Sequence, residues 1–227
     1  MNKRLRDILA CPTCREPLTF DEGLRCCGCG TVFEERNGIP ILLDEASRRD
    51  ILNFYQGQPV RDERTMKRRS RSWSERLVCR FTNPPSRKIG DVTVTNLCKL
   101  WRLLEAAGSE PRVLTVGKLK PCINGQRLDQ FPELCALEAA SLRLDITTGP
   151  AVDVVGDGHK LPFLDSSVDA AIALTTLKHL RNPFIFVSEL HRVLKPGGLV
   201  YAQCVLFDPY IDGRVIMSTL PPRVLSN

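Results

Sequence analysis

The sequence contains no run of apolar residues long enough to cross a bilayer, which takes about 20. Its first residues, MNKRLRDILACPTC, carry charge but lack the apolar core of a signal peptide. Internal repeats and low-complexity tracts are absent as well. These absences predict a cytoplasmic protein without a membrane span.

The composition is that of a globular protein with a surplus of cysteine. Of the 227 residues, 43% are hydrophobic and 26% are charged, which is ordinary. The length suits one α/β domain with a small appendage. Ten cysteines are present, and four of them form two Cys-x-x-Cys pairs. In a reducing compartment such pairs indicate metal ligands rather than disulfides.

The positive charge is concentrated in one segment. Residues 61–88 contain ten Lys or Arg and three Asp or Glu, whereas the remaining 22 basic and 23 acidic residues nearly cancel. The net charge of +6 therefore comes from this segment. Because clustered basic residues neutralise phosphates, residues 61–88 are a candidate RNA contact, although a solvated linker explains them equally well.

Changes in composition divide the chain into three parts. Residues 1–44 form a compact module that contains the paired cysteines and ends in NGIPILLD. Residues 45–90 are polar and basic, and predict a linker with some helix around 63–80. Residues 91–227 show strands alternating with helices, which is typical of a doubly wound, mostly parallel α/β sheet.

The third part predicts a helix that stops at Gly108, a fitting C-cap, and five strands after it. The segment NPFIFVSELHRVL, between the last two strands, predicts an amphipathic helix stopped by KPGG. We expect the strands at 112–116, 142–146, 152–157, 167–177 and 199–207.

The cysteine pairs predict a structural zinc site. Tetrahedral Zn²⁺ takes four thiolates, and a two-residue gap lets one tight turn direct both sulfurs at one point. Either Cys26 or Cys27 could be the third ligand, and Cys26 is preferred because it restores the Cys-x-x-Cys spacing with Cys29. The alternatives to a zinc site are reduced structural thiols or a redox pair. Four protein ligands leave no open position, so the role is structural. The predicted ligands are Cys11, Cys14, Cys26 and Cys29.

The residues around these cysteines resemble a known family. The segments LRDILACPTCREPL and LRCCGCGTVFEERNGIPILL, within residues 4–44, resemble the small zinc-ribbon family that includes the activator subunit of tRNA and release-factor methyltransferases. A ribbon ahead of a catalytic domain is also the arrangement of bacterial rRNA guanine-N1 methyltransferases. The resemblance implies a zinc ribbon that can contact a protein partner.

The third part resembles the class I S-adenosylmethionine-dependent methyltransferases. The segment VDVVGDGHKLPFLDSSVDAAIALTTLKHLRNPFIFVSELHRVLKPGGLVY is similar to the methyltransferase type 11 branch, and the similarity covers residues 112–210. It implies a Rossmann-like fold that binds S-adenosylmethionine at the carboxyl ends of its strands.

The resemblance also implies roles for individual residues. Asp145 would hold the ribose hydroxyls, Asp157 and the amide of Gly158 the adenine, and Leu174 would face the methionine portion. Gly117 is the retained glycine of the first-strand loop. No catalytic base is assigned, and His159 lies in the expected cofactor mouth without a defined role.

Two features depart from the family pattern. In VLTVGKLKPCINGQ, Leu119 and Pro121 stand where the second and third glycines belong. If the loop is rerouted, cofactor binding is weakened but measurable; if Lys118–Pro121 fill the pocket, binding is lost. The chain also continues only about 22 residues past the fifth strand, which predicts an incomplete sheet edge that a partner chain can use.

Three hypotheses of function follow. The first is an enzyme that transfers a methyl group from S-adenosylmethionine to a macromolecular acceptor such as RNA, or to an unidentified one. The second is a catalytically inactive methyltransferase-like subunit with a structural or regulatory role in a larger, RNA-containing assembly. The third is a zinc-ribbon nucleic-acid-binding protein on an inert scaffold.

Overall fold

The computed structural model describes the amino-terminal module and most of the α/β part of the chain. The basic segment 61–88, the helix expected around 63–80 and the loop residues Lys118–Pro121 lie outside the described residues. The described ranges are 3–21, 23–56, 89–108, 110–117, 122–123, 126–149, 151–174 and 176–204.

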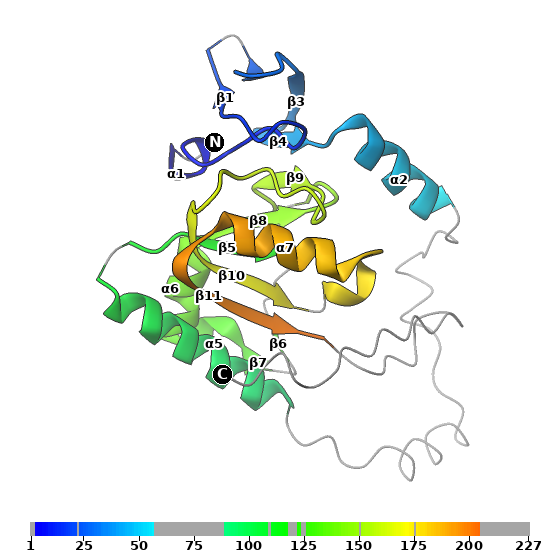
Figure 1. Ribbon diagram of the computed structural model, residues 1–227. Helices are drawn as coiled ribbons and strands as arrows, with labels where there is room; N and C mark the ends of the chain where they lie inside the picture. Colours follow the sequence, from blue (N-terminus) through cyan, green and yellow to red (C-terminus); the bar gives the residue numbers. More distant parts are fainter. Residues whose placement is uncertain are drawn as a thin grey trace, which may run out of the picture.

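One nine-stranded sheet runs through the described part of the chain (Figure 1), in the order β1-β2-β3-β4-β9-β8-β5-β10-β11. The neighbouring pairs from β4 to the β11 end of this order are all parallel, which confirms the mostly parallel α/β sheet. Its five carboxyl-terminal strands are β5 (Val113–Val116), β8 (Ser141–Asp145), β9 (Val154–Gly156), β10 (Val168–Leu174) and β11 (Leu194–Gln203).

Helices cover both faces of the parallel strands. Successive residues of a strand point to opposite faces of the sheet, so alternate residues of β10 contact the two helix layers. Ala170 and Ile172 of β10 pack with α5 (Ile89–Ala106) and α6 (Pro132–Ala140). Ala171 of the same strand faces the core that contains α7 (Pro183–Val193). Figure 1 shows α7 crossing one face of the sheet, opposite to α5 and α6.

The cysteine module folds as a short helix and an antiparallel ribbon. Asn37-Gly38, with φ of 52° and 79°, forms the tight turn between β3 and β4, as Asn-Gly does in two-residue hairpins. Its elements are α1 (Lys3–Arg6), β1 (Leu18–Thr19), β2 (Leu24–Cys26), β3 (Val32–Arg36) and β4 (Ile39–Leu42).

The last ribbon strand belongs to the central sheet. Ile41 of β4 is in register with Val155 of β9, and Leu42 with Gly156, in a parallel pair. Helix α2 (Glu45–Gln56) follows directly and lies on the side to which the strand arrows of β10 and β11 point (Figure 1). The ribbon thus adds four strands beyond β9.

The ribbon and the parallel sheet also share a hydrophobic core. Leu9 bridges to Phe163, the amide of Ala10 donates to the carbonyl of Pro162 at 3.0 Å, and the amide of Leu164 donates to the carbonyl of Ile8 at 2.9 Å. Apolar side chains of α1, the first cysteine turn, the parallel strands and α7 form one buried cluster. The division at residues 44 and 90 stays a prediction, since a shared core does not test it.

The sequence placed the parallel strands and α7 correctly but missed smaller elements. Helix α6 begins at Pro132, and two short strands, β6 (Cys122–Ile123) and β7 (Gln126–Arg127), form a separate pair. The KPGG segment, expected as a turn, lies within β11: Leu194 is already extended and pairs with Val168, and a register shift follows before Ala170.

Among the described residues β11 has one strand neighbour, β10. The described part of the chain contains no helix with the length and apolar character needed to cross a bilayer.

Candidate functional site

The site residues expected from the sequence lie at the carboxyl ends of neighbouring strands. Gly117 directly follows β5, Asp145 ends β8, Asp157 directly follows β9 and Leu174 ends β10. These strands stand side by side in the order β9-β8-β5-β10. The structure therefore brings the predicted residues to one edge of the sheet, where open α/β sheets bind their ligands.

Gly117 occupies a position that favours glycine. Its φ is +87°, and a Cβ there would lie 2.8 Å from the hydroxyl of Thr176. That hydroxyl donates to the carbonyl of Val116 at 2.7 Å, while the amide of Gly117 donates to the carbonyl of Leu144 at 2.8 Å. The turn after β5 is thus held against the ends of β8 and β10, at the switch point of the sheet.

Asp145 closes a turn at the end of β8. Its Oδ1 accepts hydrogen bonds from the amide and the hydroxyl of Thr147, both at 3.0 Å. These bonds fix the half-buried carboxylate at the strand end, where the family resemblance implies contact with a ribose.

Asp157 is a buried carboxylate that stays ionised. Its Oδ1 accepts from the amide of His159 at 2.9 Å and contacts His159 Nδ1 at 2.8 Å, while its Oδ2 accepts from the hydroxyl of Ser47 at 2.8 Å. Burial alone would raise the pKa of Asp157, but the hydrogen bonds from His159 and Ser47 outweigh it and lower the pKa to about 2.

The neighbours of Asp157 are packed tightly. A Cβ on Gly158 would lie 3.2 Å from the ring of Phe186, so the loop approaches α7 closely. His159 Nε2 accepts from the amide of Asn182 at 3.2 Å, which joins this loop to the start of α7. Both ring nitrogens of His159 are therefore engaged, and the structure gives this residue a bracing position.

Helix α2 reaches the same edge, which the sequence did not predict. Asp44 caps the helix by accepting from the amide of Ser47 at 2.7 Å, and also pairs with Lys160. Asp50, one turn of the helix after Ser47, pairs with Arg181. Only the change from a hydrophobic strand to DEAS, a helix start, could have indicated α2.

A buried ion pair within α7 is also contacted by the ribbon. Glu189 of α7 binds Arg192 through two hydrogen bonds of 2.7 and 2.9 Å and accepts from the amide of Leu161 at 3.0 Å. Arg15, next to the first cysteine pair, contacts the same carboxylate at 3.2 Å. Burial alone would lower the pKa of Arg192. The hydrogen bonds to Glu189 and Asp165 and their negative charges outweigh this effect and raise the pKa. In sequence, only the i,i+3 spacing of Glu189 and Arg192 hinted at this pair.

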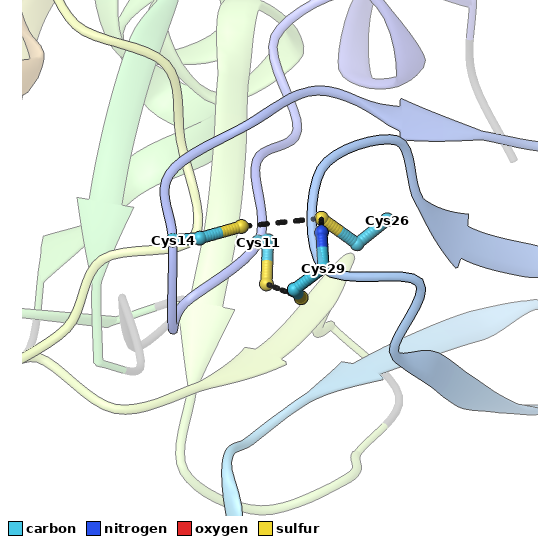
Figure 2. Close-up of side chains that lie close together, drawn as sticks. All are labelled: Cys11, Cys14, Cys26 and Cys29. Atoms are coloured by element: carbon cyan, nitrogen blue, oxygen red, sulfur yellow. Dashed lines mark hydrogen bonds between the residues drawn. The ribbon is translucent and has the colours of Figure 1, made fainter.

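The four cysteines expected as ligands come together at the ribbon tip (Figure 2). All four sulfurs lie within 4.8 Å of one another, with Cys11 and Cys29 3.7 Å apart and Cys14 and Cys26 3.3 Å apart. Four sulfurs at about 2.3 Å from a tetrahedral Zn²⁺ would be about 3.8 Å apart. The cluster therefore fits the ion with little adjustment.

The second cysteine turn is built like a metal knuckle. The amides of Gly28 and Cys29 donate to Cys26 Sγ at 3.3 and 3.4 Å, as amides do around a metal-bound sulfur. Burial outweighs these two hydrogen bonds and raises the pKa of the Cys26 thiol to about 12. Contacts of side chain and backbone with Thr31 lower the pKa of Cys29 to about 6, so this thiol ionises readily. Cys27 is exposed and is not among the clustered cysteines.

Comparison with known proteins supports a methyltransferase domain. The family described as "Methyltransferase domain" matches residues 127–202. The chain is 36% identical over 87 residues to the biotin biosynthesis bifunctional protein BioHC of Teredinibacter turnerae, covering 31% of this chain and 15% of that protein. It is 35% identical over 72 residues to an uncharacterized methyltransferase of a Mycobacterium species, covering 29% of each chain.

A solved structure, that of the cyclase SpnF, aligns over 73% of this chain and 63% of that one, at 22% identity and a TM-score of 0.33. That score is too low to carry an argument. The chain spans less than a third of the two curated relatives named above. Residues 127–202 thus match a methyltransferase domain within the part of the chain where the sequence predicted one, whereas the resemblance of residues 4–44 to the zinc-ribbon family stays a prediction.

Proposed function

We propose that this chain binds S-adenosylmethionine at the carboxyl edge of its parallel sheet and catalyses methyl transfer. The observation that carries the proposal is the pair of carboxylates, Asp145 and Asp157, at the ends of adjacent strands in a chain that contains a methyltransferase domain. Carboxylates at these positions suit the ribose hydroxyls and the adenine amine.

The residues present suit the cofactor. The bound cofactor would supply an activated methyl group on a sulfonium. Asp145 would accept from the ribose hydroxyls, Asp157 and the amide of Gly158 would address the adenine, and the turn at Gly117 would let the backbone approach the methionine portion. Leu174 would line that end as an apolar wall. Direct displacement at sulfur chiefly requires alignment of the acceptor and exclusion of water.

The cysteine cluster supports structural Zn²⁺. Four sulfurs at near-tetrahedral separations are the ligands of a closed site, so Cys11, Cys14, Cys26 and Cys29 would hold the ribbon tip together. Because Cys11 and Cys26 belong to the core shared with the parallel strands, this metal would also stabilise the surface that supports residues 161–164.

The acceptor that we favour is a macromolecule, RNA being the leading candidate. The surplus of basic residues in 61–88 supports this choice, as does the ribbon next to it. Affinity for RNA should then fall steeply with salt, because each neutralised phosphate releases counterions. Unchanged affinity after four of these arginines and lysines become glutamate would contradict an RNA acceptor bound through this segment.

An inactive, regulatory subunit is the second candidate. It is favoured by the residues Leu119 and Pro121 at two glycine positions, and by the hydrogen bond of Ser47 to Asp157. A protein partner would then dock on the ribbon or at the side of β11 that has no strand neighbour among the described residues.

Calorimetric titration of the full chain with S-adenosylhomocysteine separates the two candidates. We expect measurable binding that Asp145→Asn weakens about tenfold or more, because a hydrogen bond to a charged group contributes about 1.5–3 kcal/mol. Asp169→Asn is the matched control, since Asp169 lies at the opposite end of β10, bonded to Lys195 and the amide of Arg112. Absence of binding at millimolar ligand would support the inactive subunit.

A further inference from the structure

Helix α2 is fastened across the edge of the sheet by its first two turns. Three of its side chains each contact a different residue of the loops after β9 and β10: Asp44 pairs with Lys160, Ser47 bonds to Asp157, and Asp50 pairs with Arg181. Asp44 is the helix cap, so the start of α2 and its attachment depend on the same residue.

The central contact uses an atom that the cofactor needs. Oδ1 of Asp157 already has two donors from His159, which belong to the same loop and move with it. Oδ2 accepts from Ser47, which is 110 residues away in sequence and 3% exposed. The oxygen left for an adenine amine is therefore Oδ2, and the buried side chain of Ser47 lies against it at 2.8 Å and covers its approach.

The remaining contacts of α2 with these loops allow release. The side chain of Lys160 is 42% exposed and that of Arg181 is 65% exposed, and ion pairs so close to solvent contribute little to stability. The helix stays linked to the ribbon when it leaves the edge, because α2 follows β4 in the chain with only Leu43 and Asp44 between them.

We propose that α2 is an autoinhibitory latch, with Ser47 competing with the adenine of the cofactor for Oδ2 of Asp157. This inference rests on the proposed function, because it concerns the same cofactor edge. The cofactor binds when Ser47 withdraws, and apparent affinity is reduced by the fraction of molecules in which the latch is closed. The ribbon, through α2, thereby controls access to the site.

Calorimetry of the full chain with S-adenosylhomocysteine tests the latch. If it is closed in about nine molecules of ten, Ser47→Ala should bind about tenfold more tightly than the wild type. Asp50→Asn, which removes one exposed ion pair, should give a smaller gain of about twofold. Arg49→Gln, an exposed change on the same helix, is the control and should leave affinity unchanged.

Hydrogen exchange of the α2 amides gives a second measurement that does not depend on the affinity gain. Saturating S-adenosylhomocysteine should speed exchange in Glu45–Gln56 of the wild type, because the helix is displaced. Slower exchange, or an affinity of Ser47→Ala equal to or weaker than that of the wild type, would overturn the latch and leave the proposed function standing. Failure of the wild type and both variants to bind at millimolar ligand would overturn the proposed function as well.

Discussion

Replacing Glu189 by alanine tests how much the buried ion pair of α7, which Arg15 of the ribbon also contacts, contributes to stability. The side chains of Glu189 and Arg192 are 8% and 10% exposed, and two hydrogen bonds of 2.7 and 2.9 Å link them. Glu189→Ala would leave the guanidinium with the exposed carboxylate of Asp165 as its one anionic partner, beside the carbonyls of Leu161 and Phe163, and the amide of Leu161 would lose its acceptor. Loss of one partner from a buried pair costs about 3–5 kcal/mol.

We expect a loss near the lower limit, about 3 kcal/mol, because Asp165 still compensates part of the charge on Arg192. Urea unfolding of the full chain, followed by circular dichroism, would measure it as a lower midpoint with an unchanged slope. In a chain of this length the melting temperature should fall by roughly 6–12 °C. Glu189→Gln keeps an acceptor for Leu161 and should lose less.

Glu133→Ala is the matched control. Glu133 also pairs with an arginine at 2.7 Å, but the side chain of that partner, Arg102, is 67% exposed. Its loss should cost under about 1 kcal/mol. If Glu189→Ala cost no more than this control, the buried pair of α7 would contribute no more to stability than an exposed one.

Three further predictions concern the metal, the acid range and the first-strand turn. Cys14→Ser should release zinc, measured by elemental analysis, and unfold the ribbon, whereas Cys27→Ser should retain the metal; wild-type protein without stoichiometric metal would contradict the site. The folded pKa of Asp157, about 2, lies below the ordinary value of about 3.9, so its contribution of roughly 2 kcal/mol to the free energy of unfolding is present above pH 4 and is lost as pH falls through 2. In urea unfolding, the stability that Asp157→Asn loses relative to the wild type should therefore shrink over that range. A loss that stays constant with pH would contradict the assignment. Gly117→Ala should lower the free energy of unfolding by at least about 1–2 kcal/mol in the same assay and abolish cofactor binding, because φ is +87° and the new methyl group would meet Thr176. An unchanged urea midpoint would show that the turn tolerates a side chain.

The sequence predicted the parallel strands because their apolar runs and the family motifs mark them locally. The cysteine spacing likewise predicted which four sulfurs converge. What it could not predict depends on contacts between distant residues. Ser47 meets Asp157 across 110 positions, and Arg15 meets Glu189 across 174. No local period or motif connects such pairs, so α2 at the sheet edge was not foreseen.

Helix α6 was missed for a different reason. The segment PELCALEAA is short and carries no strong apolar stripe, although Pro132 at its first turn is a typical helix start. Conversely, KPGG was assigned to a turn by its composition, yet its backbone continues into β11 with Gly197 at φ +78°. Tertiary pairing with β10 overrides the local preference of these residues.

The pairing of β4 with β9 sets the order in which this chain can fold during synthesis. Ile41 leaves the ribosome 114 residues before its partner Val155, and ribosomes add about 5–20 residues per second. The edge of β4 that pairs with β9 therefore stays without its partner strand for roughly 6–23 s. During that interval an apolar strand edge is open to wrong partners, and the sheet closes late through a contact of high sequence separation. Charged residues of β3 and α2 precede and follow β4 in the chain, and charged side chains near an open strand edge disfavour pairing with other chains.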